Sequence, residues 1–422
     1  MTRSLLAIVV VAGCSFRSSG ATDAASGDDD ARRDASDIDA KAVASCDSSS
    51  WADALLPGPN TIYVAATTSS TIQDGTQTHP YTSLSFALGT AHPGDRISLA
   101  AGTYGGSMLN QVHGTATAPI WIEGPTSAPR AVFTGTMQLV QPQYVVIRHV
   151  DFANIAGSAL AIDDGGDRTE VVAHHIAIDD VTGTQIGQRV FLLTGVSNVA
   201  ITRSSAISSA NGILLVGCHH VEVSRFTASA LTNIAAETAG GSDDVEIRQS
   251  KFTTAGLRAV WIGGNSLETE FRPPLVNATG NYEAANIRVF DNVINTASGG
   301  TAIACSLCTS SAIAANYIYG QYSYIVRLID EHGPVGGFSF VASGGIRMAD
   351  NAMEVTGDPY GFRVETGTDG SQCTFANNLW YEVDAPANSM PTLPTPESNG
   401  IYGVPSGYDL DGQLCTGAAA HA

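Results

Sequence analysis

The sequence contains few lysines and few charged residues of any kind. Lys41 and Lys251 are the two lysines among 422 residues, and charged residues make up 14% of the chain. Long exposed helices are built largely from Lys, Glu and Leu, so this shortage argues against a helical protein. Glycine is abundant at 44 residues, and small and β-branched residues dominate the rest. This composition is typical of short strands joined by tight turns, in a chain long enough to bury a large core.

Positive charge is also scarce. The formal net charge is −20; residues 15–45 contribute −3 and Arg3 contributes +1, which leaves −18 on the chain from Cys46 onward. Such a surface repels nucleic acid and anionic lipid headgroups, so we expect neither as a partner. A polyanionic glycan would need a bridging divalent cation. The sequence also lacks a Ser-His-Asp hydrolase signature, a phosphate-binding glycine loop and a dinucleotide fingerprint.

The apolar run at the N-terminus, from Leu5 to Ala12, is too short to cross a bilayer. It follows the basic Arg3 and precedes small residues, which are the parts of an export signal. Val11-Ala12-Gly13-Cys14 resembles the lipobox of bacterial lipoproteins. The resemblance implies that residues 1–13 are a signal peptide and that Cys14 is lipidated. The alternative is an ordinary signal peptide with an incidental cysteine.

Residues 14–45 contain no segment that could bury an apolar face, and they include the acidic run Asp28-Asp29-Asp30. We expect a disordered acidic tether that links the lipid to the folded domain at the bacterial cell envelope, with the lipid as its one membrane contact. An exported protein meets oxidising conditions, where cysteines can pair. Cys305 and Cys308 form a CxxC, which alone is weak evidence for zinc. We expect a structural or free-thiol role there.

From Tyr144 onward one pattern recurs nine times: an apolar position, another two residues later and a third seven residues after the first. The repeats start at Val145, Val171, Val199, Val221, Val245, Ile287, Ser311, Ile346 and Cys373. Steps mostly in the twenties, with alternation inside each unit, predict a solenoid of strands. Five residues after the later starts lie Ser250, Asn292, Asn316, Asn351 and Asn378. Asparagine tolerates left-handed backbone, so these side chains can stack in a ladder on consecutive turns.

Each unit closes with another alternating segment, which gives three short strands per coil. Upstream, Leu84, Ala87, Leu88 and Ala91 share one helical face. We expect this helix to cap the open end of the solenoid. The segments around it, between residues 60 and 104, resemble the start of the pectate-lyase-like β-helix superfamily, in which asparagine ladders also occur.

We therefore predict an all-β fold: a single-stranded right-handed parallel β-helix of about nine or more coils with an N-terminal capping helix. The β-helix domain is expected at residues 46–385, with the cap at about 60–104, and an irregular tail at 386–422. We expect a monomer.

In that superfamily the substrate usually lies along one sheet, so the outward positions of the closing strands are the candidate binding face. Alternation turns Asp163, Val216 and Gly263 outward, together with Arg327 and the candidate substrate-binding residues Glu237, Trp261, Arg363 and Glu365. An aromatic ring can stack on a sugar, and charges can bind hydroxyls or a uronate. The alternative is a solvated sheet face without a role.

The longest step between repeats is 42 residues and carries a loop from Gly263 through Phe271-Arg272-Pro273 to Tyr282-Glu283. Long insertions in a solenoid gather on its functional face. The catalytic candidates are Arg258, Arg272, Glu283 and Arg327, and Tyr282 is a further binding candidate. This combination resembles one in bacterial β-helix proteins of unassigned activity. The alternative is that Arg272 and Glu283 pair with each other and fix the loop.

Two reactions known on this fold are considered. Polysaccharide lyases remove the proton α to a uronate carboxylate with Lys or Arg as the base, but Lys251 stands in a turn and arginine gives up its proton reluctantly. Glycoside hydrolases need two carboxylates at a set separation, and no pair can be assigned from the spacing.

We expect no bound metal other than calcium. The acid-rich turns at Asp163–Asp167, Asp179-Asp180 and Asp243-Asp244 are candidate ligands, although Asp-Gly is also ordinary turn chemistry. The pairs His174-His175 and His219-His220 cannot chelate by themselves, because adjacent strand residues face opposite sides. One histidine of each pair is expected inside.

The sequence thus predicts an exported lipoprotein that binds a polysaccharide along its β-helix face, with uronate β-elimination as the reaction if it is an enzyme. The alternative is a non-catalytic module that attaches glycan or envelope partners, favoured by the missing base and the negative body. A purely structural solenoid would show no clustered charge on the closing-strand face.

Overall fold

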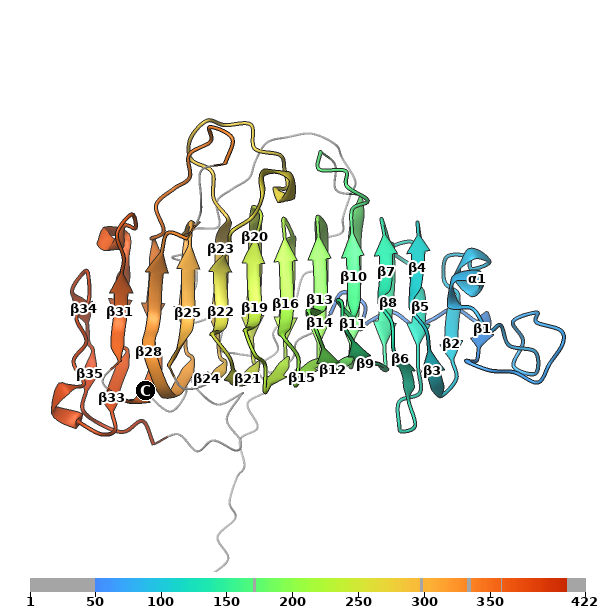
Figure 1. The fold of residues 1–422 in the computed structure, drawn as a ribbon, viewed down its shortest axis with the longest axis horizontal. Helices are drawn as coiled ribbons and strands as arrows, with labels where there is room; N and C mark the ends of the chain where they lie inside the picture. Colours follow the sequence, from blue (N-terminus) through green and yellow to red (C-terminus); the bar gives the residue numbers. More distant parts are fainter. Residues whose placement is uncertain (1–49, 170–171, 297–298, 332–334, 358, 408–422) are drawn as a thin grey trace, which may run out of the picture.

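Three long parallel sheets form the body of the protein in a computed structural model (Figure 1). The structure describes residues 50–169, 172–296, 299–331, 335–357 and 359–407. The expected export signal, Cys14 and the tether up to residue 45 lie outside the described residues. Within the described part of the chain, no helix is both long and apolar enough to cross a membrane.

Each coil contributes one strand in turn to sheets A, B and C. Sheet A consists of β1 (Thr61–Val64), β2 (Arg96–Leu99), β5 (Ile120–Glu123), β8 (Gln143–Arg148), β11 (Ala173–Asp179), β14 (Val196–Thr202), β17 (His219–Ser224), β20 (Ser242–Arg248), β23 (Ala284–Phe290), β26 (Cys308–Thr309), β27 (Ser311–Ala314), β29 (Ile346–Ala349), β32 (Thr374–Ala376) and β34 (Glu397–Ser398). Sheet B consists of β3 (Gly102–Tyr104), β6 (Ala131–Phe133), β9 (Val150–Ile155), β12 (Thr182–Ile186), β15 (Ser205–Ile207), β18 (Thr227–Ser229), β21 (Lys251–Ala255), β24 (Val293–Thr296), the first part of β28 (Tyr317–Ile329), β30 (Ala352–Thr356), β33 (Leu379–Glu382) and β35 (Ile401–Tyr402). Sheet C consists of β4 (Ser107–Asn110), β7 (Met137–Val140), β10 (Leu160–Asp163), β13 (Arg189–Thr194), β16 (Asn211–Val216), β19 (Ile234–Ala239), β22 (Arg258–Gly263), β25 (Gly300–Ser306), the second part of β28 and β31 (Tyr360–Val364).

Alternation inside each strand builds the core. Ile178 of β11 pairs in register with Ile147 of β8 and Ile201 of β14, and all three are fully buried. The predicted all-β parallel solenoid is confirmed. One repeat was assigned wrongly: the strand equivalent to Val145 starts at Ile176, not Val171. The acidic turn before β11 lengthens this coil, so a search for even spacing selects a start that is too early.

The asparagine ladder runs along the corner between sheets A and B. Asn316 Oδ1 accepts from the backbone N–H of Asn292 at 3.1 Å and from its side-chain amide at 3.0 Å, and Asn351 and Asn378 repeat both bonds one coil further on. The left-handed residue is the one before each ladder asparagine, at Asp291, Ala315, Asp350 and Asn377. The ladder is therefore present as predicted, while the left-handed backbone lies at the residue before each asparagine. Their amides cap the turn carbonyls instead, as Asn292 does with that of Phe290 at 2.9 Å.

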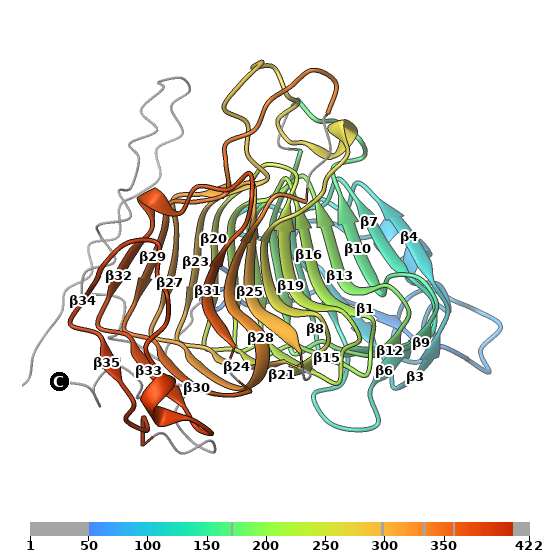
Figure 2. The same cartoon turned by 60° about the vertical axis from the view of Figure 1, so that its left-hand side comes forward.

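The two ends of the solenoid are closed differently. Helix α1 (Leu84–Gly89) buries Leu84, Ala87 and Leu88 against the first coils, and Ser83 caps it by accepting from the N–H of Phe86. At the other end, β34 and β35 extend sheets A and B beyond residue 385, where the expected domain ended. The 3₁₀ turns η3 (Gly370–Gln372) and η4 (Pro386–Asn388) lie in this region. Figure 2 shows these last elements at the end opposite to β1.

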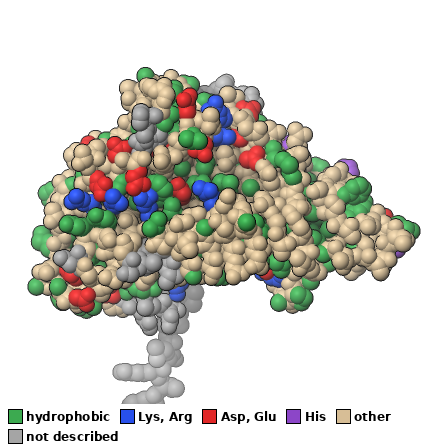
Figure 3. Space-filling model, in the orientation of Figure 1, with side chains coloured by type: hydrophobic (Ala, Val, Ile, Leu, Met, Phe, Trp, Pro, Cys, Tyr) green, Lys and Arg blue, Asp and Glu red, His purple; other side chains and the backbone are tan. Residues whose placement is uncertain are grey.

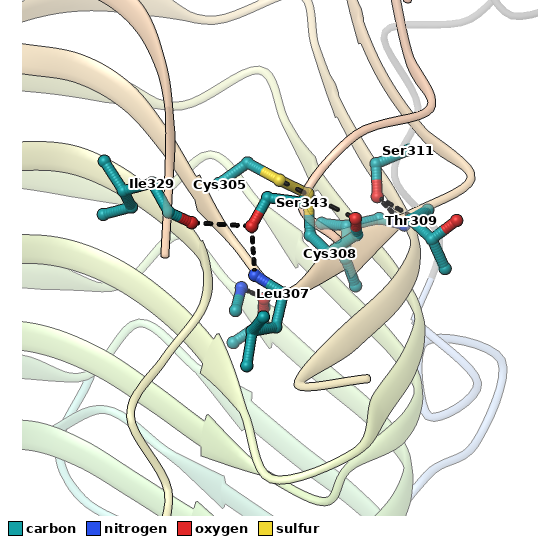
Figure 4. Close-up of a disulfide and its surroundings, with 10 residues drawn as sticks. Cys305, Leu307, Cys308, Thr309, Ser311, Ile329 and Ser343 are labelled. Carbon is teal, nitrogen blue, oxygen red and sulfur yellow. Dashed lines mark hydrogen bonds between the residues drawn. A yellow bond between two sulfur atoms is a disulfide. The ribbon is translucent and has the colours of Figure 1, made fainter. Parts of the chain in front are cut away.

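Cys305 and Cys308 form a disulfide where the coil turns from β25 into β26 (Figure 4). Ser343 lies beside it, accepting from the N–H of Leu307 and donating to the carbonyl of Ile329, both at 2.6 Å. The CxxC therefore has a structural role at this corner. Cys218 and Cys373 are buried free thiols.

Candidate active site on the outer face of sheet C

Outward side chains of sheet C stand in register from coil to coil. One column contains Glu237, Trp261, Ala304, Arg327 and Arg363, on β19, β22, β25, β28 and β31. The neighbouring column contains Arg258, Thr301, Tyr324 and Tyr360. The outward placement predicted for Glu237, Trp261, Arg327 and Arg363 is confirmed, and Figure 3 shows basic and acidic side chains in a row across the C-terminal part of this face.

The same column is apolar toward the N-terminus. Ala161, Leu192 and Leu214 precede Glu237 on β10, β13 and β16. Leu214 packs with Val216 and Ala239 in a small cluster outside the main core. Charge and aromatic rings therefore gather on one part of the face, from Glu237 onward.

Glu237 is the first charged residue of this column after its apolar part. It is partly buried, and its carboxylate makes no hydrogen bond or ion pair with the described residues. Burial raises the pKa of Glu237 to about 7, against the opposing effect of the positive charges of Arg189 and Arg258. A β-bulge lies at this position, since Glu237 pairs with Trp261 but Thr238 pairs with Gly263. Bulges commonly re-aim side chains beside active sites.

Two further polar groups beside Glu237 lack partners. The Nε atom of Arg189 and the indole Nε1 of Trp261 are both buried and form no hydrogen bond among the described residues. Arg258 stacks on the Trp261 ring at 4.1 Å and pairs with Glu331 at 2.8 Å. Buried groups without partners are costly unless a ligand or water satisfies them. Here they surround a carboxyl group that titrates near neutral pH.

The loop between β22 and β23 starts directly above this carboxyl. Gly263 has a φ of +86°, and a Cβ there would lie 1.7 Å from the carbonyl oxygen of Ser306. An added Cβ on Gly264 would lie 2.7 Å from the Cβ of Ala239 and 3.5 Å from Glu237 Oε1. Because neither position has room for a side chain, the loop can leave the sheet close to Glu237.

Glu283 holds the far end of this loop. It is fully buried, and its carboxylate accepts from the N–H of Gly240 and the N–H of Ser266, both at 2.7 Å, and from the Ser266 hydroxyl at 2.6 Å. These bonds tie the two ends of the loop, at Ser266 and Glu283, to Gly240 in the coil of β19; we call this part the loop root. These contacts of Glu283 are those of an anchor, and its predicted catalytic role stays a prediction.

Arg272 holds the middle of the loop, but not through Glu283. Its Nε and Nη2 atoms bind the two oxygens of Asp164 at 2.7 and 3.2 Å, and Asp164 is only 1% exposed. The turn after β10 is thereby joined to a loop 108 residues later. The alternative that Arg272 and Glu283 pair with each other is wrong; each anchors the loop separately.

A second loop, between β28 and β29, packs against the first. The rings of Phe271 and Phe340 lie 5.4 Å apart, and the side-chain amide of Asn281 donates to the carbonyl of Ser339 at 3.0 Å. Arg168, in the turn after β10, donates to the carbonyl of Glu268 in η2 (Glu268–Glu270) at 3.1 Å. Figure 1 shows all three connections rising from the same edge of the solenoid.

The other predicted site residues are divided between this face and the loops. Arg327 is on the face, where it pairs with Glu365 at 2.7 Å. Arg363 is exposed and lies in the same column as Ala304, two strands further toward the C-terminus. Tyr282 is partly buried beside Glu283 at the end of the loop, next to β23 rather than in sheet C. The structure therefore brings together Glu237, Trp261 and Arg258 on sheet C, whereas Arg272, Glu283 and Tyr282 belong to the loop between β22 and β23.

The acidic turns are occupied by protein groups. Asp163 accepts from Gly165, Asp167 from Thr169, Asp179 from Arg203 and Asp180 from Arg130. The described residues contain no group of three or more His, Cys, Asp or Glu side chains placed to hold a metal ion. Calcium binding stays a prediction.

The expectation that one histidine of each pair is packed inside is wrong. His175 and His220 have φ values of 56° and 54°, which breaks the alternation of β11 and β17. Neither member of either pair is packed inside; His174 and His175 are partly exposed with their Nδ1 atoms 3.0 Å apart, and His220 pairs with Asp244 at 2.6 Å.

Several site residues were not found from the sequence. Arg189 was missed altogether, whereas Asp164 and Glu331 were noted as acidic residues but not as partners of Arg272 and Arg258; all three act across one or more coils, and their spacing in the chain carries no signal of this. The outward position of Arg189 at the start of β13 could have been found by aligning its strand with β16, to which it pairs at Asn211.

The fold is shared with solved structures of carbohydrate-active proteins. The mannuronan C-5 epimerase AlgE6 A-module of Azotobacter vinelandii aligns with a TM-score of 0.54 at 14% identity over 75% of this chain and 92% of that chain. A glycoside hydrolase aligns with a TM-score of 0.52 at 8% identity over 79% and 99%. The lacto-N-biosidase of Eubacterium ramulus aligns with a TM-score of 0.50 at 12% identity over 81% and 67%. No family model and no curated protein sequence matches the chain.

The chain has a right-handed parallel β-helix fold, the fold shared with these solved structures. At these identities the likeness establishes the β-helix and nothing of its chemistry. The chemistry has to be inferred from the outer face of sheet C.

Proposed function

We propose that this protein is an exported, lipid-anchored β-helix enzyme that binds an acidic polysaccharide along sheet C and transfers a proton through Glu237. One observation carries the proposal: Glu237 has a partly buried carboxyl that accepts no hydrogen bond from the described residues. Burial raises its pKa to about 7 even though Arg189 and Arg258 lie nearby. A group with such a pKa can both accept and donate a proton at neutral pH. The Trp261 ring beside it offers an apolar face to a sugar.

The substrate class follows from the charges near Glu237. The protein is strongly negative overall, yet Arg189, Arg258 and Arg327 stand on this face. Guanidinium groups bind carboxylates with two parallel hydrogen bonds, so a uronate would be held here while neutral glycans would gain less. The similar solved structures include an epimerase of mannuronan and glycoside hydrolases, which supports a glycan as the ligand of this fold.

The reaction we favour is β-elimination. Ionised Glu237 would take the proton from the carbon next to the uronate carboxyl, while an arginine stabilises the carboxylate as it takes on charge. The electron pair left behind forms the new double bond, and the bond to the 4-linked oxygen breaks. That oxygen needs a proton, which the protonated Glu237 carboxyl or water can supply. The arginines proposed from the sequence stay protonated near neutral pH, whereas Glu237 loses its proton there and can then act as a base.

The loops hold this site rather than react. Glu283 and the pair of Arg272 with Asp164 keep the loop between β22 and β23 in place above Glu237. We assign them as positioning residues. Export and lipidation at Cys14 rest on the sequence features of residues 1–14.

The test uses the chain from residue 46 onward, incubated with several uronate polysaccharides with and without Ca²⁺. Ultraviolet absorbance follows unsaturated products, and a reducing-end assay follows hydrolysis. We expect an absorbance rise that increases with pH up to about 7, as Glu237 ionises, and that Glu237→Gln lowers at least a hundredfold. Glu246→Gln, an outward glutamate of sheet A, is the control and should leave the rate unchanged.

Hydrolysis is distinguished by the sign of the pH dependence. A general acid is active when protonated, so reducing ends that form faster below pH 7 would replace elimination with hydrolysis at the same residue. Tight binding of a uronate polysaccharide without any product would instead support the non-catalytic module. If no uronate polysaccharide is bound or changed, the proposed function is wrong.

A further inference from the structure

The pairing of an arginine with an aromatic ring recurs along sheet C. Arg258 lies over Trp261 at 4.1 Å, Arg327 over Tyr324 at 5.0 Å, and Arg363 over Tyr360 at 5.5 Å. The rings of Tyr324 and Tyr360 stack on neighbouring coils, 5.7 Å apart. The features that surround Glu237 are therefore repeated at the C-terminal end of the same face.

The last of these pairs is the most open. Tyr360 is 62% exposed, and Arg363 forms no ion pair with any described residue. By contrast, Arg258 and Arg327 are paired with Glu331 and Glu365. An anion arriving at Arg363 meets a guanidinium that no carboxylate of the described protein neutralises.

A cavity of about 500 Å³ opens beside this pair. Sheet C has no strand after β31 in the described chain, and residues 389–394 run past it instead. Pro391 and Pro394 of this segment lie against Gly361 and Gly370, and a proline offers no N–H to pair with a strand edge. The cavity lies between β31, β33 and this segment. It is lined by apolar side chains together with Tyr360, Arg363, Tyr381, Glu382 and Asn388.

We propose that Tyr360, Arg363 and this cavity form a distal subsite that binds one end of an anionic oligosaccharide whose reacting residue lies at Glu237. The proposal rests on the proposed function and adds to it a minimum chain length. Strands in a sheet lie 4.7–4.9 Å apart, so the four steps from β19 to β31 span about 19 Å. A short oligosaccharide bound at Glu237 cannot reach Arg363, whereas a longer one lies along Trp261 and Arg327 and ends at the cavity.

The chemistry of the subsite matches a terminal uronate. Arg363 binds its carboxylate, Tyr360 stacks on the ring, and the apolar wall of the cavity takes the uncharged face of the sugar. A cavity of this size lies within the range of small-ligand sites, and it closes the row of subsites at one end.

The test measures binding without turnover, by calorimetry on Glu237→Gln with oligogalacturonates and oligomannuronates from dimer to octamer. For at least one series, affinity should rise with length until the chain spans four coils and then level off. Adding Arg363→Gln or Tyr360→Ala should weaken the octamer about tenfold and leave the dimer unchanged. Arg203→Gln, an arginine paired with Asp179 at the corner of sheets A and B, is the matched control and should change neither.

The outcomes separate this inference from the proposed function. Equal affinity of all lengths, an equal loss for dimer and octamer in Arg363→Gln, or no oligouronate binding overturns the distal subsite. If the wild-type protein degrades a polysaccharide and Arg363→Gln does so with the same KM, the subsite is wrong while catalysis stands. If long oligomers bind through Arg363 but no product ever forms, the subsite stands and catalysis at Glu237 is wrong.

Discussion

The root of the long loop and the face of sheet C each contain a glutamate, fully buried at the loop root and partly buried on the face, and the two are held in opposite ways. At the loop root, Glu283 is fully buried and accepts three hydrogen bonds from Gly240 and Ser266. On the face, Glu237 accepts none from the described residues, and burial raises its pKa to about 7. The loop root is organised like a core, whereas the face holds a group that the fold alone leaves unsatisfied.

The difference teaches where function can be sought in a repetitive fold. A satisfied buried carboxylate stabilises the structure, since the surrounding N–H groups would otherwise lose their partners. An unsatisfied one costs stability, and such a cost persists most often where a ligand or a reaction needs the group. The comparison predicts that changing Glu283 damages folding and that changing Glu237 damages function.

The largest effect is expected at Glu283. Glu283→Ala removes the acceptor of two buried N–H groups and one hydroxyl, which should lower the free energy of unfolding by about 4 kcal/mol. Glu222→Gln is the control, because Glu222 pairs with Arg248 on the outer face of sheet A while partly exposed and should cost less than about 1 kcal/mol. Urea unfolding followed by tryptophan fluorescence measures both. Equal losses in the two variants would contradict the anchoring role.

The next effect is a gain of stability at Glu237. Since its pKa in the folded protein is raised above the ordinary value of 4.5, the native state binds protons more readily than the unfolded state. Stability therefore falls as pH rises from about 4.5 to about 7. Glu237→Gln lacks this loss, so it should match the wild type near pH 4 and exceed it by about 2 kcal/mol at pH 8. Unfolding curves at several pH values check this, and a constant difference would show that Glu237 is not the titrating group.

Much of the fold could be predicted from the sequence because its core obeys local rules. Ile147 and Val289 repeat the alternation of buried strands, and Asn316 marks a turn by its chemistry. Errors arose where one coil departs from the regular spacing or one residue departs from the regular alternation. The acidic turn before β11 shifted one repeat, and left-handed backbone at His175 broke the alternation that placed one histidine of the pair inside.

The site could be predicted only in part. Alternation placed Glu237 and Trp261 outward, which the register confirms, but it could not show that Glu237 would lack partners. Long-range pairs were inaccessible for a physical reason: Arg272 meets Asp164 across 108 residues, because coils that are far apart in the chain are stacked in space. The alternative considered from the sequence paired Arg272 with Glu283, although the geometry gave each its own role.

The smallest effect is expected at the pair of Arg272 and Asp164, which joins the two regions. It lies between the loop root and the face, and it restrains the middle of the loop above Glu237. Arg272→Lys keeps the charge but loses the bidentate geometry, so it should cost about 1 kcal/mol, and Asp164→Asn in the same background should add little more. Hydrogen exchange should rise in residues 264–274 while the amides around Asn316 stay protected. If exchange instead rises equally in the ladder, the pair supports the whole solenoid, and the loop is not a separate unit placed over the face.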